Sequence, residues 1–313
     1  MITKIRIGTR ESKLAIWQAN YAKKKLQDLG INCEIIKIRS EGDINQITPL
    51  YDFGVSGIFT KNLDQALLNN RIDIAVHSLK DVPINMASGL TIQCVFERAD
   101  PNDVVVYKNK SVNLEKKLTI ATSSIRRKTQ WLKKYPGHEI VSLRGNVGTR
   151  INKLKNNEWD GAIFAKAGLD RLSIDPKHFE LIEWMVPSAA QGVVGVATRS
   201  NDLVINKLLK SINCKKTYWC VTQERRFLKL MNGGCSVPIS GYAFFNDDKL
   251  HFKVNITSLS SKKSVTVFQE YETTDEHAFE KIYSQLMIEG GKEILDELKK
   301  ENLKKLKFFL QKY

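Results

Sequence analysis

The chain has 313 residues, enough for two or three domains of ordinary size. With 42% hydrophobic residues, 27% charged residues and only 7 Pro, its composition excludes a disordered tail protein, a collagen-like repeat and a disulfide-packed mini-protein. Its 49 Lys and Arg against 34 Asp and Glu give a net charge of +15, which favours a polyanionic ligand: nucleic acid, a membrane surface or a polycarboxylate.

The arginines are concentrated in one part of the chain. Four of them, Arg126, Arg127, Arg144 and Arg150, fall within 25 residues of a chain whose positive charges are mostly lysine. The guanidinium group is a planar fork that matches carboxylates and phosphates, whereas lysine is the usual solubilising surface charge. This concentration predicts an anion-binding site.

The cysteines number five and show no CxxC spacing, so neither a disulfide framework nor a zinc module is expected. The start, MITKIRIGTR, alternates apolar and polar residues and does not read as a signal peptide. No apolar run reaches the length of about 18 residues that a membrane span requires. The chain is expected to be soluble and cytoplasmic.

Periodic patterns in the first third of the chain alternate between those of strands and helices. Strands are predicted over 4–8, 33–39 and 72–77, and helices over 12–29 and 58–68. This rhythm predicts a parallel or mixed sheet with helices on its faces.

The same rhythm restarts near residue 103 and predicts a second α/β unit. Its predicted elements are strands over 118–121, 140–144 and 161–165 and helices over 125–134 and 148–154, and a strand predicted over 191–199 leads out of this unit. From about Thr217 the pattern changes to one helix reaching Met231, two or three strands, and a lysine-rich terminal helix after about Asp275. We therefore expect two α/β units and one smaller α+β unit.

Polar residues follow directly on the buried strand over 72–77, in the run Ser78-Leu79-Lys80-Asp81-Val82-Pro83. Ligands of open α/β sheets bind outside the carboxyl ends of the strands, where this run emerges. Asp81 is thus a candidate acid, base or cation stabiliser. The alternative is a structural turn aspartate paired with Lys80, and His77 is expected to be a hydrogen-bonded core histidine.

Two basic runs begin at the ends of successive predicted strands. Residues 122–127 (TSSIRR) and 143–150 (LRGNVGTR) combine Arg with hydroxyl or glycine residues at helix starts, where free N–H groups bind anions. Each run alone fits a surface ion-pair patch equally well, but together they predict a multi-anion site. A GxxxxGK[ST] loop is missing, which disfavours a nucleotide triphosphatase.

Cys235 lies in the run Gly233-Gly234-Cys235-Ser236-Val237-Pro238, where two glycines give access to the thiol. The end of the preceding helix would not lower the pKa of this thiol, and no Cys–His pairing motif is evident. The residues alone leave open whether Cys235 is reactive or a small buried hydrophobe.

Seven motifs, taken in chain order, resemble the porphobilinogen deaminase (hydroxymethylbilane synthase) family. They are IGTRESKLAIWQA, HSLKDVP, TSSIRR, LRGNVGTR, AGLDRL, AAQGVVGV and NGGCSVP. The resemblance runs from about residue 4 into the third unit and thins over the last 70 or so residues.

The resemblance implies two similar doubly wound α/β domains with a hinged cleft, plus a smaller α+β C-terminal domain. The expected domains are 1–98 completed by 197–215, 99–196, and 216–313. The implied enzyme joins four porphobilinogen molecules head to tail into the linear tetrapyrrole hydroxymethylbilane, releasing ammonia, on a covalent dipyrromethane primer. No metal, nucleic acid or membrane partner is expected, and the enzyme is expected to be a monomer.

The resemblance also implies roles for individual residues. Asp81 matches the catalytic carboxylate, and Cys235 matches the cysteine that holds the cofactor by a thioether. The expected cofactor-binding residues are Lys80, Asp81, Ser124, Arg126, Arg127, Arg144 and Arg150. The expected substrate-binding residues are Arg10, Ser12, Arg144, Arg150, Arg171 and Gln191. These basic residues suit the chemistry, because every pyrrole ring carries an acetate and a propionate.

The chain departs from the family pattern at three positions. Ser56 stands where the family usually has Lys, in the 42–57 loop that is thought to cover the cleft, so one anion contact is in doubt. Ala190 replaces a usual Gly, and Ala197 replaces a usual acidic residue.

Two other functions fit parts of the sequence. A non-enzymatic two-domain anion-binding module would share the strand–helix rhythm but would have no use for Cys235. A nucleic-acid-binding protein would show strongly salt-dependent binding, and no recognised module for it is found. A covalent mass increment of two pyrroles would distinguish the enzyme from both.

Overall fold

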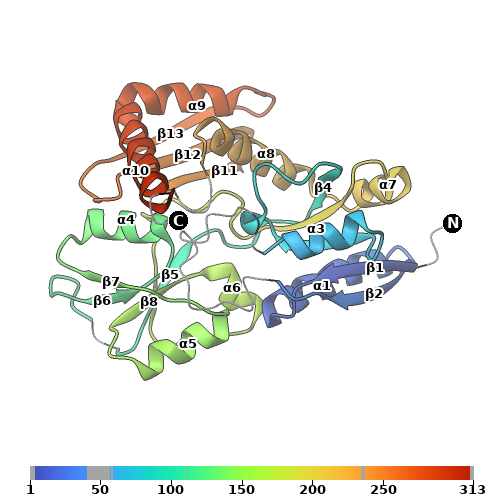
Figure 1. Cartoon of the computed structure of the whole chain (residues 1–313), viewed down its shortest axis with the longest axis horizontal. Helices are drawn as coiled ribbons and strands as arrows, with labels where there is room; N and C mark the ends of the chain where they lie inside the picture. Colours follow the sequence, from blue (N-terminus) through green and yellow to red (C-terminus); the bar gives the residue numbers. More distant parts are fainter. Residues whose placement is uncertain (1–3, 41–56, 58, 111, 234–236, 311–313) are drawn as a thin grey trace.

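A computed structural model gives the fold and describes residues 4–310 apart from 41–56, 58, 111 and 234–236 (Figure 1). The strands among these described residues form two five-stranded sheets and one three-stranded sheet. The two α/β units and the smaller α+β unit expected from the sequence are therefore present, which confirms the fold class. The division at residues 98, 196 and 215 stays a prediction.

The first sheet has the strand order β2-β1-β3-β10-β4. These strands are β1 (Lys4–Thr9), β2 (Asn32–Lys37), β3 (Ile74–Ser78), β4 (Leu90–Val95) and β10 (Val194–Arg199). The helices of this unit are α1 (Lys13–Gln27), α3 (Lys61–Leu68) and α7 (Leu203–Ser211). β1 pairs in parallel with β2 and β3, whereas β10 runs antiparallel to β3 and β4, so the sheet is mixed.

The second sheet repeats this plan in the order β7-β6-β8-β5-β9. Its strands are β5 (Asp103–Tyr107), β6 (Thr119–Ala121), β7 (Glu139–Val141), β8 (Gly161–Ala165) and β9 (Phe179–Leu181). Its helices are α4 (Ile125–Lys134), α5 (Val147–Asn156) and α6 (Lys166–Arg171). β6 is parallel to β7 and β8, and β5 is antiparallel to its neighbours.

The third sheet, β11-β12-β13, is an antiparallel meander that packs against helices from the end of the chain (Figure 1). Its strands are β11 (Ile239–Asn246), β12 (Lys249–Thr257) and β13 (Ser264–Glu272). Its helices are α8 (Lys215–Leu230), α9 (Ala278–Leu286) and α10 (Lys292–Leu310). The single terminal helix expected after Asp275 is wrong, because a π-helical turn with Gly290 at φ +102° separates α9 from α10.

Two crossovers, over residues 96–102 and 182–193, connect the first and second sheets and lie side by side. The Phe96 N–H donates to the Val194 carbonyl at 3.0 Å, and the Ala99 N–H donates to the Gly192 carbonyl at 3.1 Å. Gly192 has φ +81°, and a Cβ there would lie 2.5 Å from the Ala99 oxygen. Only glycine fits this backbone position without strain.

Most predicted elements are present with ends shifted by a few residues. The strand predicted over 140–144 ends at Val141, because the Leu143 N–H turns away and donates to Ser123 Oγ at 2.8 Å. The helix predicted over 58–68 begins at Lys61, and Ile58 lies outside the described residues.

Candidate active site

Lys80 and Asp81 lie on a single 3-10 turn, Leu79–Asp81, directly after β3. Leu79 is fully buried, and its N–H donates to the Val193 carbonyl at 2.9 Å. A Cβ at Gly195 would come within 2.9 Å of the Leu79 side chain, so β10 approaches this turn closely. The apolar anchor of Leu79 thus fixes the two charged residues beside the second crossover.

Lys80 links this turn to Gln191 on that crossover, since its Nζ donates to Gln191 Oε1 at 3.1 Å. Burial and the nearby Arg127 lower the pKa of Lys80 to about 8, although Asp81 and Asp103 act in the opposite direction. Lys80 therefore lies between groups of both sheets. His77, just before the turn, is buried and its pKa falls to about 4, mainly through burial, as expected of a core histidine.

Asp103, at the start of β5, is the centre of the polar network. Its carboxylate accepts from Arg126 Nη2 at 2.6 Å, from Arg127 Nε and Nη2 at 3.0 and 2.8 Å, and from Gln191 Nε2 at 2.9 Å. Burial opposes its ionisation, but the two guanidinium groups outweigh burial and hold the pKa of Asp103 below its usual range. Asp103 therefore fixes the orientation of both arginines.

Sequence reasoning missed Asp103. An acidic residue at the head of the strand Asp-Val-Val-Val-Tyr reads as an ordinary strand start. The available signal was a carboxylate directly before an apolar run that is expected to be buried. A buried charge requires a partner, so this aspartate should have a basic residue nearby. Arg126 and Arg127, the two predicted forks, are those partners in the structure.

Arg144, just before α5, is buried, and Arg150, near the start of α5, is half-buried. Arg150 Nε donates to the Gly145 carbonyl at 2.6 Å, and Gly145 has φ +111°, a conformation that favours glycine. Burial, followed by the charges of Arg127 and Arg144, lowers the pKa of Arg150 to about 10, while Asp81 raises it.

Arg10 follows β1, and its guanidinium carbon lies 4.3 Å from the centre of the Phe59 ring. The charge of Arg10 also lowers the pKa of Arg150, which places Arg10 near the same group of charges. Arg171, the last residue of α6, donates to the Gly192 carbonyl at 2.6 Å, and its guanidinium carbon lies over the Trp17 ring.

Two predicted site serines are helix caps. Ser12 Oγ accepts from the Ala15 N–H at the start of α1, and Ser124 Oγ accepts from the Arg127 N–H at the start of α4. Each cap fixes where its helix begins and hence where the adjacent basic residues lie. Their predicted contacts with cofactor or substrate stay predictions.

The charge interactions join most of the predicted site into one cluster, which we call the cationic cluster. Its cations are Lys80, Arg10, Arg126, Arg127, Arg144 and Arg150. Among the described residues, Asp81 and Asp103 are the carboxylates whose charges act on this cluster, and its six cations outnumber these two by four. Such an excess in a partly buried site calls for a polyanion, and a dipyrromethane with an acetate and a propionate on each ring carries four carboxylates. The residues therefore fit the group.

Two of the three positions at which the chain departs from the family pattern, Ala190 and Ala197, lie among the described residues. Ala190 has φ +59°, where the family's usual glycine is favoured, and its N–H donates to Glu224 Oε2 at 2.6 Å. Ala197 is fully buried in β10, so an acidic side chain at this position would be desolvated. Cys235, Ser56 and residues 42–56 of the predicted loop lie outside the described residues.

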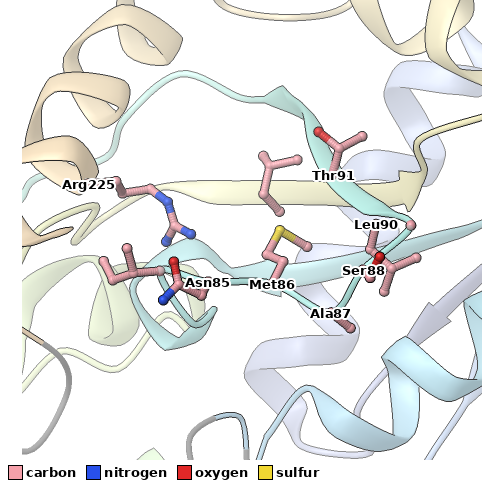
Figure 2. Close-up of a pocket in the computed structure, with 10 residues that line it drawn as sticks. Asn85, Met86, Ala87, Ser88, Leu90, Thr91 and Arg225 are labelled. Carbon is pink, nitrogen blue, oxygen red and sulfur yellow. The ribbon is translucent and has the colours of Figure 1, made fainter.

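An open pocket of about 460 Å³ lies away from this chemistry, along residues 84–92 (Figure 2). Arg225 borders it and donates to the Val82 and Pro83 carbonyls, just beyond the Asp81 turn. None of the predicted site residues lines it. Within the described residues there is no group of His, Cys, Asp and Glu suited to a metal ion, and no helix that could cross a membrane.

Family models match two parts of the chain. Residues 5–207 match the porphobilinogen deaminase, dipyromethane cofactor binding domain, and residues 218–300 match the porphobilinogen deaminase C-terminal domain. Together they span most of the chain, including every described residue of the cationic cluster.

Several whole proteins are similar in sequence. A porphobilinogen deaminase of Chlorobium phaeovibrioides is 37% identical over 309 residues, covering 94% of this chain and 97% of that protein. One of Orientia tsutsugamushi is 44% identical over 247 residues, covering 77% and 83%. Among solved structures, the VFT2 domain of BvgS from Bordetella pertussis gives a TM-score of 0.42 at 11% identity, covering 67% of this chain and 86% of that one.

Proposed function

The chain belongs to the porphobilinogen deaminase family, and from that premise we propose how its residues carry out the reaction. The family's enzymes are transferases of tetrapyrrole biosynthesis that use a dipyrromethane cofactor and act on porphobilinogen. The observation that carries the assignment of residues is the cationic cluster, in which the charge of Asp81 acts on both Lys80 and Arg150.

Lys80, Asp81, Ser124, Arg126, Arg127, Arg144 and Arg150 would hold the cofactor, with Cys235 as its attachment point. The bound dipyrromethane supplies the free pyrrole carbon from which the product chain grows. Asp103 supports this role because it keeps two guanidinium planes fixed before any carboxylate arrives, so little ordering entropy remains to be lost on binding.

Asp81 is the catalytic carboxylate of this proposal. Its turn is fixed by the buried Leu79, and it lies close enough to Lys80 and Arg150 for its charge to raise the pKa of both. An ionised carboxylate stabilises positive charge that develops on a pyrrole as ammonia leaves, and it can accept a proton from a pyrrole N–H.

Arg10, Ser12, Arg144, Arg150, Arg171 and Gln191 would bind incoming porphobilinogen. Gln191 is suited to connect the two ends of the site, because its amide bonds to both Lys80 and Asp103. We also propose that the enzyme works as a cytoplasmic monomer without a nucleic-acid partner, and that its domains divide as predicted from the sequence. Sedimentation of the purified protein at several concentrations tests the monomer.

Turnover of porphobilinogen tests the proposed function. We expect the purified protein to consume porphobilinogen, to release four ammonia molecules for each tetrapyrrole, and to form hydroxymethylbilane. An anion-binding module would bind porphobilinogen and release no ammonia, and that result would contradict the proposal.

A further inference from the structure

Arg171 connects three parts of the chain. It ends α6 beside the second sheet, and its Nη2 donates to the Gly192 carbonyl on the second crossover at 2.6 Å. Its guanidinium carbon also lies 5.4 Å from the centre of the Trp17 ring, on α1 beside the first sheet. α6 and α1 are in contact, and they lie next to each other in Figure 1.

Other aromatic side chains fix the position of the Trp17 ring. Its ring stacks on Tyr21 at 5.5 Å with only 6° between the planes, and Tyr21 meets the edge of Phe96 on the first crossover. Trp17 is 36% exposed, so its ring lies at the surface and not in the core. At Gly168, on α6, a Cβ would lie 3.9 Å from the Leu14 side chain of α1, an ordinary packing distance, so the two helices pack against each other here.

The Arg171 guanidinium lies over the Trp17 ring, with its carbon 5.4 Å from the ring centre. A cation over the face of an aromatic ring is attracted by the ring, and the N–H groups of a guanidinium lie in its plane. Arg171 uses one such N–H on the Gly192 carbonyl, and burial lowers the pKa of its guanidinium. A carboxylate approaching along the same plane would find the remaining N–H groups already oriented.

We propose that Trp17 is a positioning residue for Arg171, which holds the guanidinium plane ready for a carboxylate of porphobilinogen. Since Trp17 and Arg171 belong to helices of different sheets, carboxylate binding at Arg171 then depends on the contact between α1 and α6. This inference rests on the substrate-binding role proposed for Arg171.

The test compares Trp17→Leu and Trp17→Phe with wild-type holoenzyme. Loss of the ring in Trp17→Leu is expected to raise the KM for porphobilinogen about 2- to 30-fold, with kcat and cofactor loading unchanged. Trp17→Phe keeps an aromatic face and should restore most of the KM. Tyr218→Leu, which removes another half-exposed ring (38% exposed) on α8, is the matched control and should leave KM unchanged.

A double-mutant cycle shows whether Trp17 acts through Arg171. In an Arg171→Leu background, Trp17→Leu should raise KM no further. Additive effects, an unchanged KM in Trp17→Leu, or a lower Tm as the only change would overturn the proposal. A wild-type KM in Arg171→Leu would overturn it through its premise, whereas a wild-type protein that forms no tetrapyrrole would instead contradict the proposed function.

Discussion

Asp103 illustrates at the scale of a single residue how a site for anions can be built around an anion. Two neighbouring arginines repel each other, and both are buried here, with the Val186 and Ile163 carbonyls as neutral partners and Asp103 as the carboxylate that balances their charge. The carboxylate binds both and leaves the rest of the cationic cluster with its positive excess. Asp103 also accepts a hydrogen bond from the Gln191 amide, and the oxygen of that amide accepts one from Lys80.

Asp81→Asn tests the catalytic carboxylate, because it keeps the size of the side chain and removes its charge. A charge that acts mainly in the transition state affects rate more than binding, so we expect a loss of roughly 100- to 1000-fold in single-turnover elongation. Asp81→Glu, which keeps the charge and shifts its position, should lose less. A folded, cofactor-loaded Asp81→Asn variant that elongates at the wild-type rate would return Asp81 to the structural role.

The low pKa of Lys80, about 8, predicts a pH dependence. Below pH 8 the ammonium is charged and attracts carboxylates, and above pH 8 the amine becomes neutral and this attraction is lost. The kcat/KM for porphobilinogen, which reports groups of the free enzyme, should therefore fall as the pH rises through about 8. Lys80→Arg stays charged and should lose this inflection. An identical inflection in that variant would assign the titration to another group.

At the scale of elements, the sequence predicts well what depends on local periodicity. The alternation of Ile5 and Ile7 and the helical spacing of α4 were sufficient to find β1 and α4. The sequence predicts poorly those features that depend on residues far away along the chain. The register of β10 between β3 and β4 and the end of β7 at Val141 are set by residues far away in the chain. The site was predicted through its ordered motifs, and Asp103 was missed because its partners lie in a different element.

Gly192→Ala tests the pairing of the two crossovers. The substitution combines a positive φ with a Cβ 2.5 Å from the Ala99 oxygen, so we expect it to lower the free energy of unfolding by about 1–3 kcal/mol. Gly137→Ala is the control, since a Cβ there meets nothing within 4 Å and should change stability by less than about 0.5 kcal/mol. Equal urea midpoints for the two variants would show that the close contact between Gly192 and Ala99 is not needed for stability.

At the scale of the whole molecule, Glu224 connects the third sheet to both crossovers. From α8 its carboxylate accepts from Arg98 Nη2 at 2.6 Å on the first crossover, from the Ala190 N–H at 2.6 Å on the second, and from the Ala243 N–H at 2.8 Å on β11. Arg98 Nη1 also donates to the Gln191 carbonyl at 3.0 Å. Burial raises the pKa of Glu224, and Arg98 counteracts this effect.

Glu224→Gln keeps the shape of this connection and removes its charge. Breaking a buried ion pair by removing one partner typically costs about 3–5 kcal/mol, so we expect a loss of that size in unfolding by urea. Lys4→Gln, which removes an exposed pair with Glu34, is the control and should cost less than about 1 kcal/mol. A Glu224→Gln variant as stable as the control would show that the connection does not support the arrangement of the three sheets.

The intact mass of freshly purified protein tests the central claim, that this chain carries a covalent dipyrromethane on Cys235. The wild-type protein should be heavier than its sequence by two pyrrole units. Cys235→Ser should show the mass of the unmodified chain and no activity, whereas Cys33→Ser, which changes a buried strand cysteine, should keep the increment. An active wild-type protein at its unmodified mass, or pyrroles mapped to another cysteine, would contradict the account.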